Sequence, residues 1–221
     1  MELSEAMKLR HSVRKYKEQP LDEKIKQEIW KKIDECNKES GLHIQFITDE
    51  PKAFQGMMAR YGKFSGVTNY IALIGKKDTN LEEMCGYYGE KLVLFAQQLG
   101  LNTCWVAMTY SKIPGVFQID DGEKLTVVIS IGYGENQGVP HKSKSMEKVC
   151  KVQGDVPDWF EKGVEAALLA PTAMNQQKFV FSCNGNQVTV KPGLGFYSKI
   201  DLGIVKYHFE LGAGIQNFIW A

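Results

Sequence analysis

The 221-residue chain has no marked charge imbalance and no apolar run of the roughly 20 residues that a membrane helix needs. Lysine and arginine number 27 against 26 aspartate and glutamate, so the net charge of +1 provides no field of the kind a general nucleic-acid binder uses. MELSEAMKLR at the start has no apolar core of the signal-peptide type. We therefore expect neither nucleic acid nor a membrane among the partners.

Paired cysteines and clustered histidines are missing as well. The five cysteines form no CxxC pair, and an odd number cannot all be paired within one chain. Reduced thiols in a cytoplasm are the simplest interpretation, so we expect a cytoplasmic protein. The four histidines lie far from one another in sequence and from any paired cysteine, which disfavours zinc, and we predict no metal site.

The hydrophobic content of 43% is enough for one well-packed domain or two small ones. Apolar spacing predicts helices over residues 2–10, from Pro20 to a stop at Gly41, over 89–99, and over DWFEKGVEAALLA before Pro171. Strands are expected at HIQFIT, YIALI, TCWVAM and LTVVISIGY, and FVFSC with QVTV predicts a hairpin across NGN. LTVVISIGY is apolar on both faces, which is typical of a central, covered strand.

A weak internal repeat links two of these regions. GEKLVLFAQQLGLNTCWVA, from Gly89, aligns without a gap on GIVKYHFELGAGIQNFIWA, from Gly203. Each copy predicts a helix, a glycine stop and an apolar strand. The alternative is two ordinary helix-to-strand units that match by chance.

RHSVRKY, residues 10–16, is the most basic short stretch of the chain. If it is extended, Arg10, Ser12 and Arg14 project to one side, because side chains alternate along a strand. Two guanidinium groups that flank a hydroxyl can hold a phosphate through bidentate hydrogen bonds. The alternative is a solvated basic face.

Two further stretches carry polar groups that suit a ligand. APTAMNQQ, residues 170–177, offers several amide donors and acceptors for a heterocycle, unless it is only a polar loop that caps its own backbone. GYGENQGVPHKSK has the spacing GxGxxxG and no amphipathic helix after it, so a dinucleotide-binding turn is not expected. Its Lys142 and Lys144 add positive charge for a phosphate or are simply solvated.

Together and in this order, the motifs resemble the nitroreductase family of FMN-dependent oxidoreductases. RHSVRKY resembles that family's phosphate-binding RxSxR, and GYYGEKLVLFAQQLGLNTCW is similar to its helix followed by LGLxTCW. VISIGYGENQGVPHKSKSMEKV resembles its GY strand end with a basic pair downstream, and APTAMNQQKFVF resembles APSxxNxQPWxF. The resemblance implies an α+β fold, with a mixed sheet flanked by helices in one domain over residues 1–221.

The resemblance also implies FMN as the cofactor. Arg10, Ser12 and Arg14 would hold its phosphate with His11 adjacent, Lys142 and Lys144 would complete the charge balance, Pro171, Thr172, Ala173 and Asn175 would contact the ring and ribityl chain, and Trp105 would pack below. The implied activity is transfer of hydride from NAD(P)H to nitroaromatics, quinones or related small acceptors. No catalytic acid, base or nucleophile is expected, because the flavin performs the hydride transfer.

Two alternatives stay open at this point. One is a flavoprotein with a dedicated non-nitro substrate, of the dehalogenase or dehydrogenase type. The other is a non-enzymatic binding module that holds no flavin. The sequence identifies neither the acceptor, nor the choice between NADH and NADPH, nor the residues of a substrate pocket.

The order of the motifs departs from the usual family pattern. The APSxxNxQPW segment usually follows the first long helix, but here CNKESGLHIQFIT holds that place and APTAMNQQ lies in the second half. This order resembles a divergent branch of the family in which APTAMNQQ and DLGIVKYHFELGAG are C-terminal. Because the family's flavin usually lies between two subunits, pseudo-halves of about 1–138 and 139–221 would form an intrachain pseudo-dimer. The alternative is a homodimer that exchanges these parts between chains.

Overall fold

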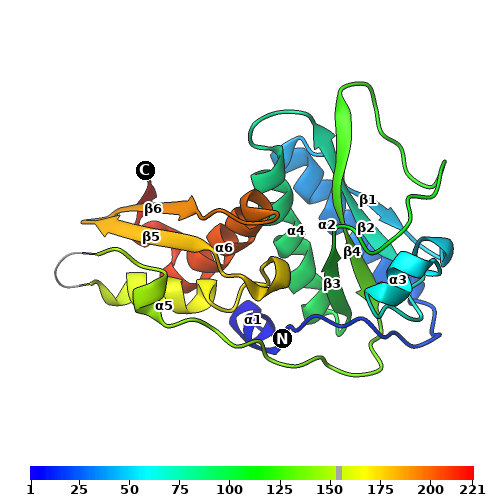
Figure 1. Cartoon of the computed structure of the whole chain (residues 1–221), viewed down its shortest axis with the longest axis horizontal. Coiled ribbons are helices and arrows are strands. Elements are labelled where there is room, and N and C mark those ends of the chain that lie inside the picture. Colours follow the sequence, from blue (N-terminus) through cyan, green and yellow to red (C-terminus); the bar gives the residue numbers. More distant parts are fainter. Residues whose placement is uncertain (153–155) are drawn as a thin grey trace. The chain divides into compact units, whose positions relative to one another are not determined.

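A computed structural model describes residues 1–152 and 156–221, and they form two compact units (Figure 1). The first unit comprises residues 1–81 and 91–140, and the second comprises residues 82–90 and 141–221. Helix α4, Leu81–Gln98, therefore contributes residues to both units. Among the described residues, no helix is long and apolar enough to cross a membrane.

A four-stranded antiparallel sheet, in the order β1-β2-β4-β3, forms the centre of the first unit. Its strands are β1 Gln45–Ile47, β2 Tyr70–Lys76, β3 Asn102–Val106 and β4 Glu123–Gly132. Strand β4 is central and mostly buried, which confirms the expectation drawn from its apolar run. Its register with β2 runs from Tyr70↔Ser130 to Lys76↔Glu123, with a bulge after Leu73.

Helices α1 Leu3–Leu9 and α2 Glu23–Ser40 of the first unit begin and end close to where the sequence predicts. The 3-10 turn η1 Lys52–Phe54 and the short helix α3 Met57–Tyr61 were not predicted. Helix α2 ends at Gly41, whose φ of 71° lies in the left-handed region where a residue without Cβ is least strained. The side chain of Asn37 exchanges two hydrogen bonds with the backbone of Ile44, which ties the end of α2 to the segment that enters β1.

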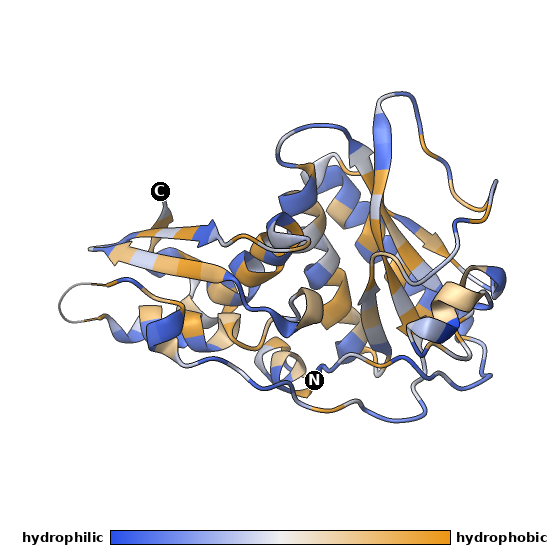
Figure 2. Cartoon of the chain, in the orientation of Figure 1, coloured by the Kyte–Doolittle hydropathy of each residue, from blue (hydrophilic) through white to orange (hydrophobic). Residues whose placement is uncertain are grey.

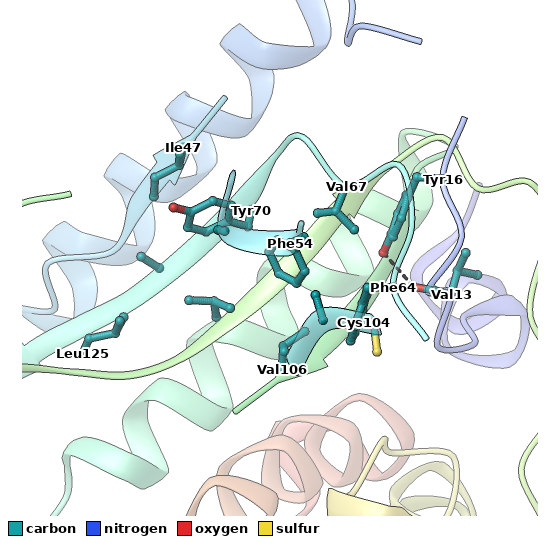
Figure 3. Close-up of a cluster of buried hydrophobic side chains, with 14 of the residues drawn as sticks. Val13, Tyr16, Ile47, Phe54, Phe64, Val67, Tyr70, Cys104, Val106 and Leu125 are labelled. Carbon is teal, nitrogen blue, oxygen red and sulfur yellow. Dashed lines mark hydrogen bonds between the residues drawn. The ribbon is translucent and has the colours of Figure 1, made fainter. Parts of the chain in front are cut away.

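An aromatic core lies within the first unit (Figure 3). Phe54 contacts Phe64 and Tyr70 edge-on, with ring centroids 5.3 and 5.8 Å apart. Tyr16 joins this cluster, and its hydroxyl donates to the Val13 carbonyl at 2.8 Å and lies 2.9 Å from Ser130 Oγ. Each fully buried aromatic side chain stabilises the unit by about 1.5–3 kcal/mol, so the core holds the residues 13–16 in place. Figure 2 shows the apolar residues concentrated in the strands.

The second unit combines helices with a three-stranded sheet in the order β5-β6-β7. Its elements are η2 Met146–Lys148, α5 Asp158–Ala167, η3 Ala173–Asn175, β5 Phe179–Asn184, β6 Gln187–Pro192, α6 Ser198–Ala213, η4 Ile215–Asn217 and β7 Ile219–Trp220. The hairpin of β5 and β6 confirms the prediction from FVFSC and QVTV. Strand β7 is parallel to β6, so the expected mixed pairing occurs in this smaller sheet.

Close packing and one buried polar pair hold α4, α5 and α6 together in the second unit. A Cβ added to Gly86 would overlap the carbonyl of Ile200, and one added to Gly203 would overlap that of Glu83. His208 and Glu90 are both fully buried, with Nε2 and Oε1 2.9 Å apart. His208 Nδ1 lies 3.1 Å from the Ala166 carbonyl, which can only accept, so Nδ1 carries a proton.

The two copies of the weak repeat share only part of their structure. Each contains a helix, a glycine of positive φ and a strand, with φ of 79° at Gly100 and 76° at Gly214. The first copy ends in β3, which pairs antiparallel with β4, whereas the second ends in the two-residue β7, which is parallel to β6. The pseudo-dimer therefore stays a prediction.

Candidate functional site

The predicted site residues divide between the two units. Arg10, His11, Ser12, Arg14 and Trp105 belong to the first, and Lys142, Lys144, Pro171, Thr172, Ala173 and Asn175 belong to the second. We call residues 10–16 the basic segment and residues 171–177 the strained loop. Each group is built by different contacts.

The basic segment is extended, as the alternation argument requires. Helix α1 ends at Leu9, and Arg10 has φ −69° and ψ 116°. Ser12 forms a parallel bridge with Thr103 of β3, and the Val13 N–H donates to the Thr103 carbonyl at 3.0 Å. Trp105 lies two residues further along the same strand and is partly buried.

Arg10, Ser12 and Arg14 all act on one group, the thiol of Cys104. Burial raises the pKa of Cys104, while Arg14, a hydrogen bond with Ser12 and Arg10 lower it in that order of size. All three side chains therefore lie near enough to Cys104 to affect its thiol. In Figure 3, Cys104 lies at the end of the core near Val13.

The two arginines differ in their access to solvent. Arg10 is only 3% exposed, whereas Arg14 is exposed and its Cζ lies 5.9 Å from the centre of the Phe64 ring. Arg14 and the partly buried Ser12 can therefore reach a ligand directly. Arg10 contributes a positive charge held inside the unit.

The glycine-rich stretch after β4 packs on the basic segment. A Cβ added to Gly138 would lie 2.7 Å from the Cβ of His11, and the φ of 72° at Gly138 also favours glycine. The Gly134 N–H donates to Asn102 Oδ1 at 3.0 Å. The glycines thus serve a close approach to residues 11–12, and the next helical element is the short η2 rather than a long helix.

The strained loop adopts an unusual backbone conformation. Met174, Asn175 and Gln177 have φ of 50°, 53° and 44°. A left-handed conformation at a non-glycine residue costs about 1–2 kcal/mol relative to the right-handed region, and it costs less at asparagine. Strain of this kind persists only where surrounding contacts impose it, and it is concentrated at functional sites.

Asp201 of α6 supplies one set of those contacts. Its Oδ1 accepts the Ala173 N–H at 2.9 Å and its Oδ2 accepts Gln176 Nε2 at 2.7 Å. Burial raises the pKa of this carboxyl to about 6, although the hydrogen bonds from Gln176 and Ala173 oppose the shift. Asp201 was not predicted from the sequence. Its signal is an acidic residue within the apolar stretch IDLGIV of α6, where only hydrogen bonding makes a buried charge tolerable.

The two lysines supply the other set. Lys144 Nζ donates to the carbonyls of Gln176 and Gln177, both at 2.8 Å. The Lys142 carbonyl accepts from Asn175 Nδ2 and Gln177 Nε2. These contacts anchor the loop, which the spacing of the two lysines did not indicate. Their role in phosphate binding stays a prediction.

One group outside these segments has metal-ligand chemistry. His43, Asp120 and Glu123 offer ligand atoms that all lie within 4.8 Å of one another. The group was not predicted from the sequence, because His43 lies far along the chain from Asp120 and Glu123. His43 Nδ1 lies 2.8 Å from Glu123 Oε2, and that oxygen also accepts the Asp120 N–H. These hydrogen bonds account for the arrangement without an ion.

A family model described as "Putative TM nitroreductase" matches residues 2–213. The chain therefore belongs to this nitroreductase family, as the resemblance predicted. Membership supports a general oxidoreductase activity. No curated protein matches the chain.

Two solved structures illustrate the shared fold. A crystal structure titled as a putative nitroreductase from Thermotoga maritima MSB8 is 24% identical, with a TM-score of 0.65, and the match covers 96% of this chain and 83% of that one. A nitroreductase family protein from Streptococcus pneumoniae TIGR4 is 14% identical, with a TM-score of 0.50, and the match covers 67% and 98%. At these identities the likeness shows the fold alone, and it confirms the expected α+β class.

Proposed function

We propose that this chain is an FMN-dependent oxidoreductase that takes hydride from NAD(P)H and reduces nitroaromatics, quinones or related small acceptors. The observation that carries the proposal is the extended backbone of the basic segment, which bears Arg10, Ser12 and Arg14 at alternate positions, in a chain of the nitroreductase family. A separate substrate-specific acid or base is not required, because bound flavin supplies the hydride chemistry.

The donor set of the basic segment fits the terminal phosphate of FMN. Charge-assisted hydrogen bonds from guanidinium groups to phosphate oxygens are shorter and stronger than neutral ones. Arg14 is exposed and Ser12 is partly buried, so these two would bind the phosphate directly. Arg10 would add positive charge from its buried position. Because Gly138 has no Cβ, it packs against His11 without a steric clash.

The strained loop would contact the ring system and ribityl chain. The side chain of Asn175 is already engaged, since it donates to the Lys142 carbonyl and accepts from Gln177. Thr172 Oγ1 accepts the Gln177 N–H at 3.0 Å. Contacts to the flavin would therefore come mainly from the backbone and the partly exposed sides of Pro171, Thr172 and Ala173.

Cys104 is not proposed as a nucleophile. Its side chain is buried, and burial raises its pKa, so the thiolate that would react is disfavoured despite the nearby arginines. The chain's residues would instead bind the cofactor and orient it.

The test begins with the absorption spectrum of the purified protein. We expect a yellow protein that releases FMN rather than FAD on denaturation, and bleaches anaerobically with NADH or NADPH. A quinone or nitroaromatic should restore the colour. A colourless protein that does not take up added FMN would refute the proposal in favour of a binding module. Flavin that stays oxidised in excess of both nicotinamides would favour a flavoprotein with a dedicated non-nitro substrate.

We retain the intrachain pseudo-dimer as a proposal about assembly. Sedimentation followed at the flavin absorbance over a range of dilutions tests it. FMN that remains with a species of 24.9 kDa would support it, and FMN held only by dimers would contradict it.

A further inference from the structure

Asp201 is a buried carboxylate with an unusual pair of partners. It is 4% exposed and lies in the first turn of α6. Burial of a charge is unfavourable unless hydrogen bonds compensate for the lost hydration. Its carboxylate accepts hydrogen bonds from the Ala173 N–H and from Gln176 Nε2, and both donors belong to the strained loop.

The two contacts bracket two of the three left-handed residues of the loop. The Ala173 N–H immediately precedes Met174, and the Gln176 side chain follows Asn175. A single carboxylate therefore spans Met174 and Asn175. Left-handed conformations at non-glycine residues persist only where surrounding contacts impose them, and this bridge adds to the contacts of Lys142 and Lys144.

Gln176 is itself held in place. Its Nε2 also donates to the Phe196 carbonyl at 2.6 Å, and a Cβ on Gly195 would overlap Gln176 Oε1. A glutamine fixed on three sides transmits the position of Asp201 to the loop. The contact is thus directional, rather than a loose surface hydrogen bond.

Rotation of the carboxylate, or replacement of one of its oxygens by an NH₂ group, would break this arrangement. An ionised aspartate offers acceptors to both N–H donors, whereas asparagine offers one acceptor and one NH₂ group. In Asp201→Asn, one of the two donors would therefore face another donor. The substitution keeps the volume of the side chain, so it tests the hydrogen bonds rather than the packing.

We propose that Asp201 is a positioning residue that holds the strained loop in the conformation that binds flavin. Its carboxylate fixes Ala173 and Gln176, and thereby sets where Pro171 and Thr172 lie. This inference rests on the proposed function, because it assigns a task to the loop that the proposed function places at the flavin.

The experiment compares Asp201→Asn with wild type and with Asp158→Asn. Asp158 is an exposed aspartate in the first turn of α5, so it is a matched control in the same unit. Amide hydrogen exchange of residues 171–177 is measured on flavin-free protein. FMN affinity is measured by titration, and the visible circular dichroism of bound FMN is recorded at saturation.

We expect Asp201→Asn to exchange the Ala173 amide about tenfold faster, the change that corresponds to losing one hydrogen bond of 1.4 kcal/mol. FMN affinity should fall by about tenfold on the same argument, and the circular dichroism of bound FMN should change. Asp158→Asn should leave all three unchanged. A second variant, Gln176→Met, removes only one partner and should give a smaller effect of the same kind.

The readouts separate the two possible failures. Unchanged loop exchange in Asp201→Asn would overturn the inference, and so would faster exchange with unchanged FMN affinity and circular dichroism. A wild-type protein that binds no FMN would refute the proposed function, while the exchange measurement would still decide whether Asp201 holds the loop. A general loss of stability would increase exchange throughout the unit, which also contradicts a positioning role confined to the loop.

Discussion

The basic segment and the strained loop are held by opposite means. The basic segment is extended, and its backbone is bonded to neighbouring backbone, as in Val13 to Thr103. The strained loop is left-handed at three non-glycine residues, and charged side chains at Asp201 and Lys144 hold it. An extended segment that pairs through its backbone depends mainly on its local sequence pattern. A strained backbone conformation, in contrast, depends on specific side chains from distant parts of the chain.

This difference predicts how each segment responds to substitution. Residues of the basic segment should be sensitive to close packing and to the loss of side-chain charge. Residues of the strained loop should be sensitive to the loss of their anchors and tolerant of glycine. The following variants test that contrast, in order of decreasing expected effect.

Gly138→Ala should disturb the packing of the basic segment. Its Cβ would lie 2.7 Å from the Cβ of His11 at a φ of 72°. Overpacking and left-handed strain together should lower the free energy of unfolding by about 2–4 kcal/mol. Gly115→Ala is the control, because it has φ 76° and no atom within 4 Å of an added Cβ. Equal losses in urea unfolding of the two variants would show that the approach to His11 has no energetic importance.

Arg14→Ala should weaken FMN binding through loss of a charge-assisted hydrogen bond. The expected loss is about 1.5–3 kcal/mol, roughly 10- to 150-fold in the dissociation constant. Lys15→Ala removes a neighbouring exposed cation and should change the affinity little. Fluorescence titration measures both. Unchanged FMN affinity in Arg14→Ala would favour the alternative that the basic segment is only a solvated basic face.

Asp201 should give the stability of the protein a characteristic pH dependence. Its pKa is raised from 3.8 to about 6 by burial, so the folded state holds the proton more tightly than the unfolded state. The resulting stabilisation is complete below the unfolded pKa and is lost as pH rises through about 6. The unfolding free energy of wild type minus that of Asp201→Asn should therefore fall by about 2 kcal/mol between pH 4 and pH 7. A flat difference would contradict the raised pKa.

Met174→Gly should be neutral or stabilising by up to about 1 kcal/mol, because glycine adopts positive φ without steric cost. Ser12→Gly, in the basic segment, should instead destabilise by about 0.5–1 kcal/mol because extended backbone gains nothing from glycine. Thermal unfolding of the two variants provides the comparison. Destabilisation by Met174→Gly would mean that its exposed side chain, rather than its backbone, stabilises the loop.

The local pattern was enough to predict much of the fold. The apolar spacing predicted α2, the central position of β4 and the hairpin of β5 and β6, because each depends on residues close in sequence. Helix α3 and the first turns of α4 were not predicted. Their periodic signals are short or begin in a polar stretch, where local preference is weak.

The candidate site depends more on contacts between residues that are far apart in sequence. Alternation predicts that Arg10, Ser12 and Arg14 share one side of the basic segment, but it did not reveal that Arg10 is buried. Asp201 and the anchoring contact of Lys144 were missed, because they join residues 25 to 33 positions apart through side chains. Such contacts depend on how the helices pack, which no short motif encodes.

The central claim is that the basic segment binds the phosphate of FMN, and titration with FMN and with riboflavin tests it most directly. The two ligands share the ring and ribityl chain and differ only in the phosphate. We predict that FMN binds about 10- to 150-fold more tightly, the contribution of a charge-assisted contact, and that Arg14→Ala removes most of the difference. Equal affinity of the wild-type protein for the two ligands would contradict the account.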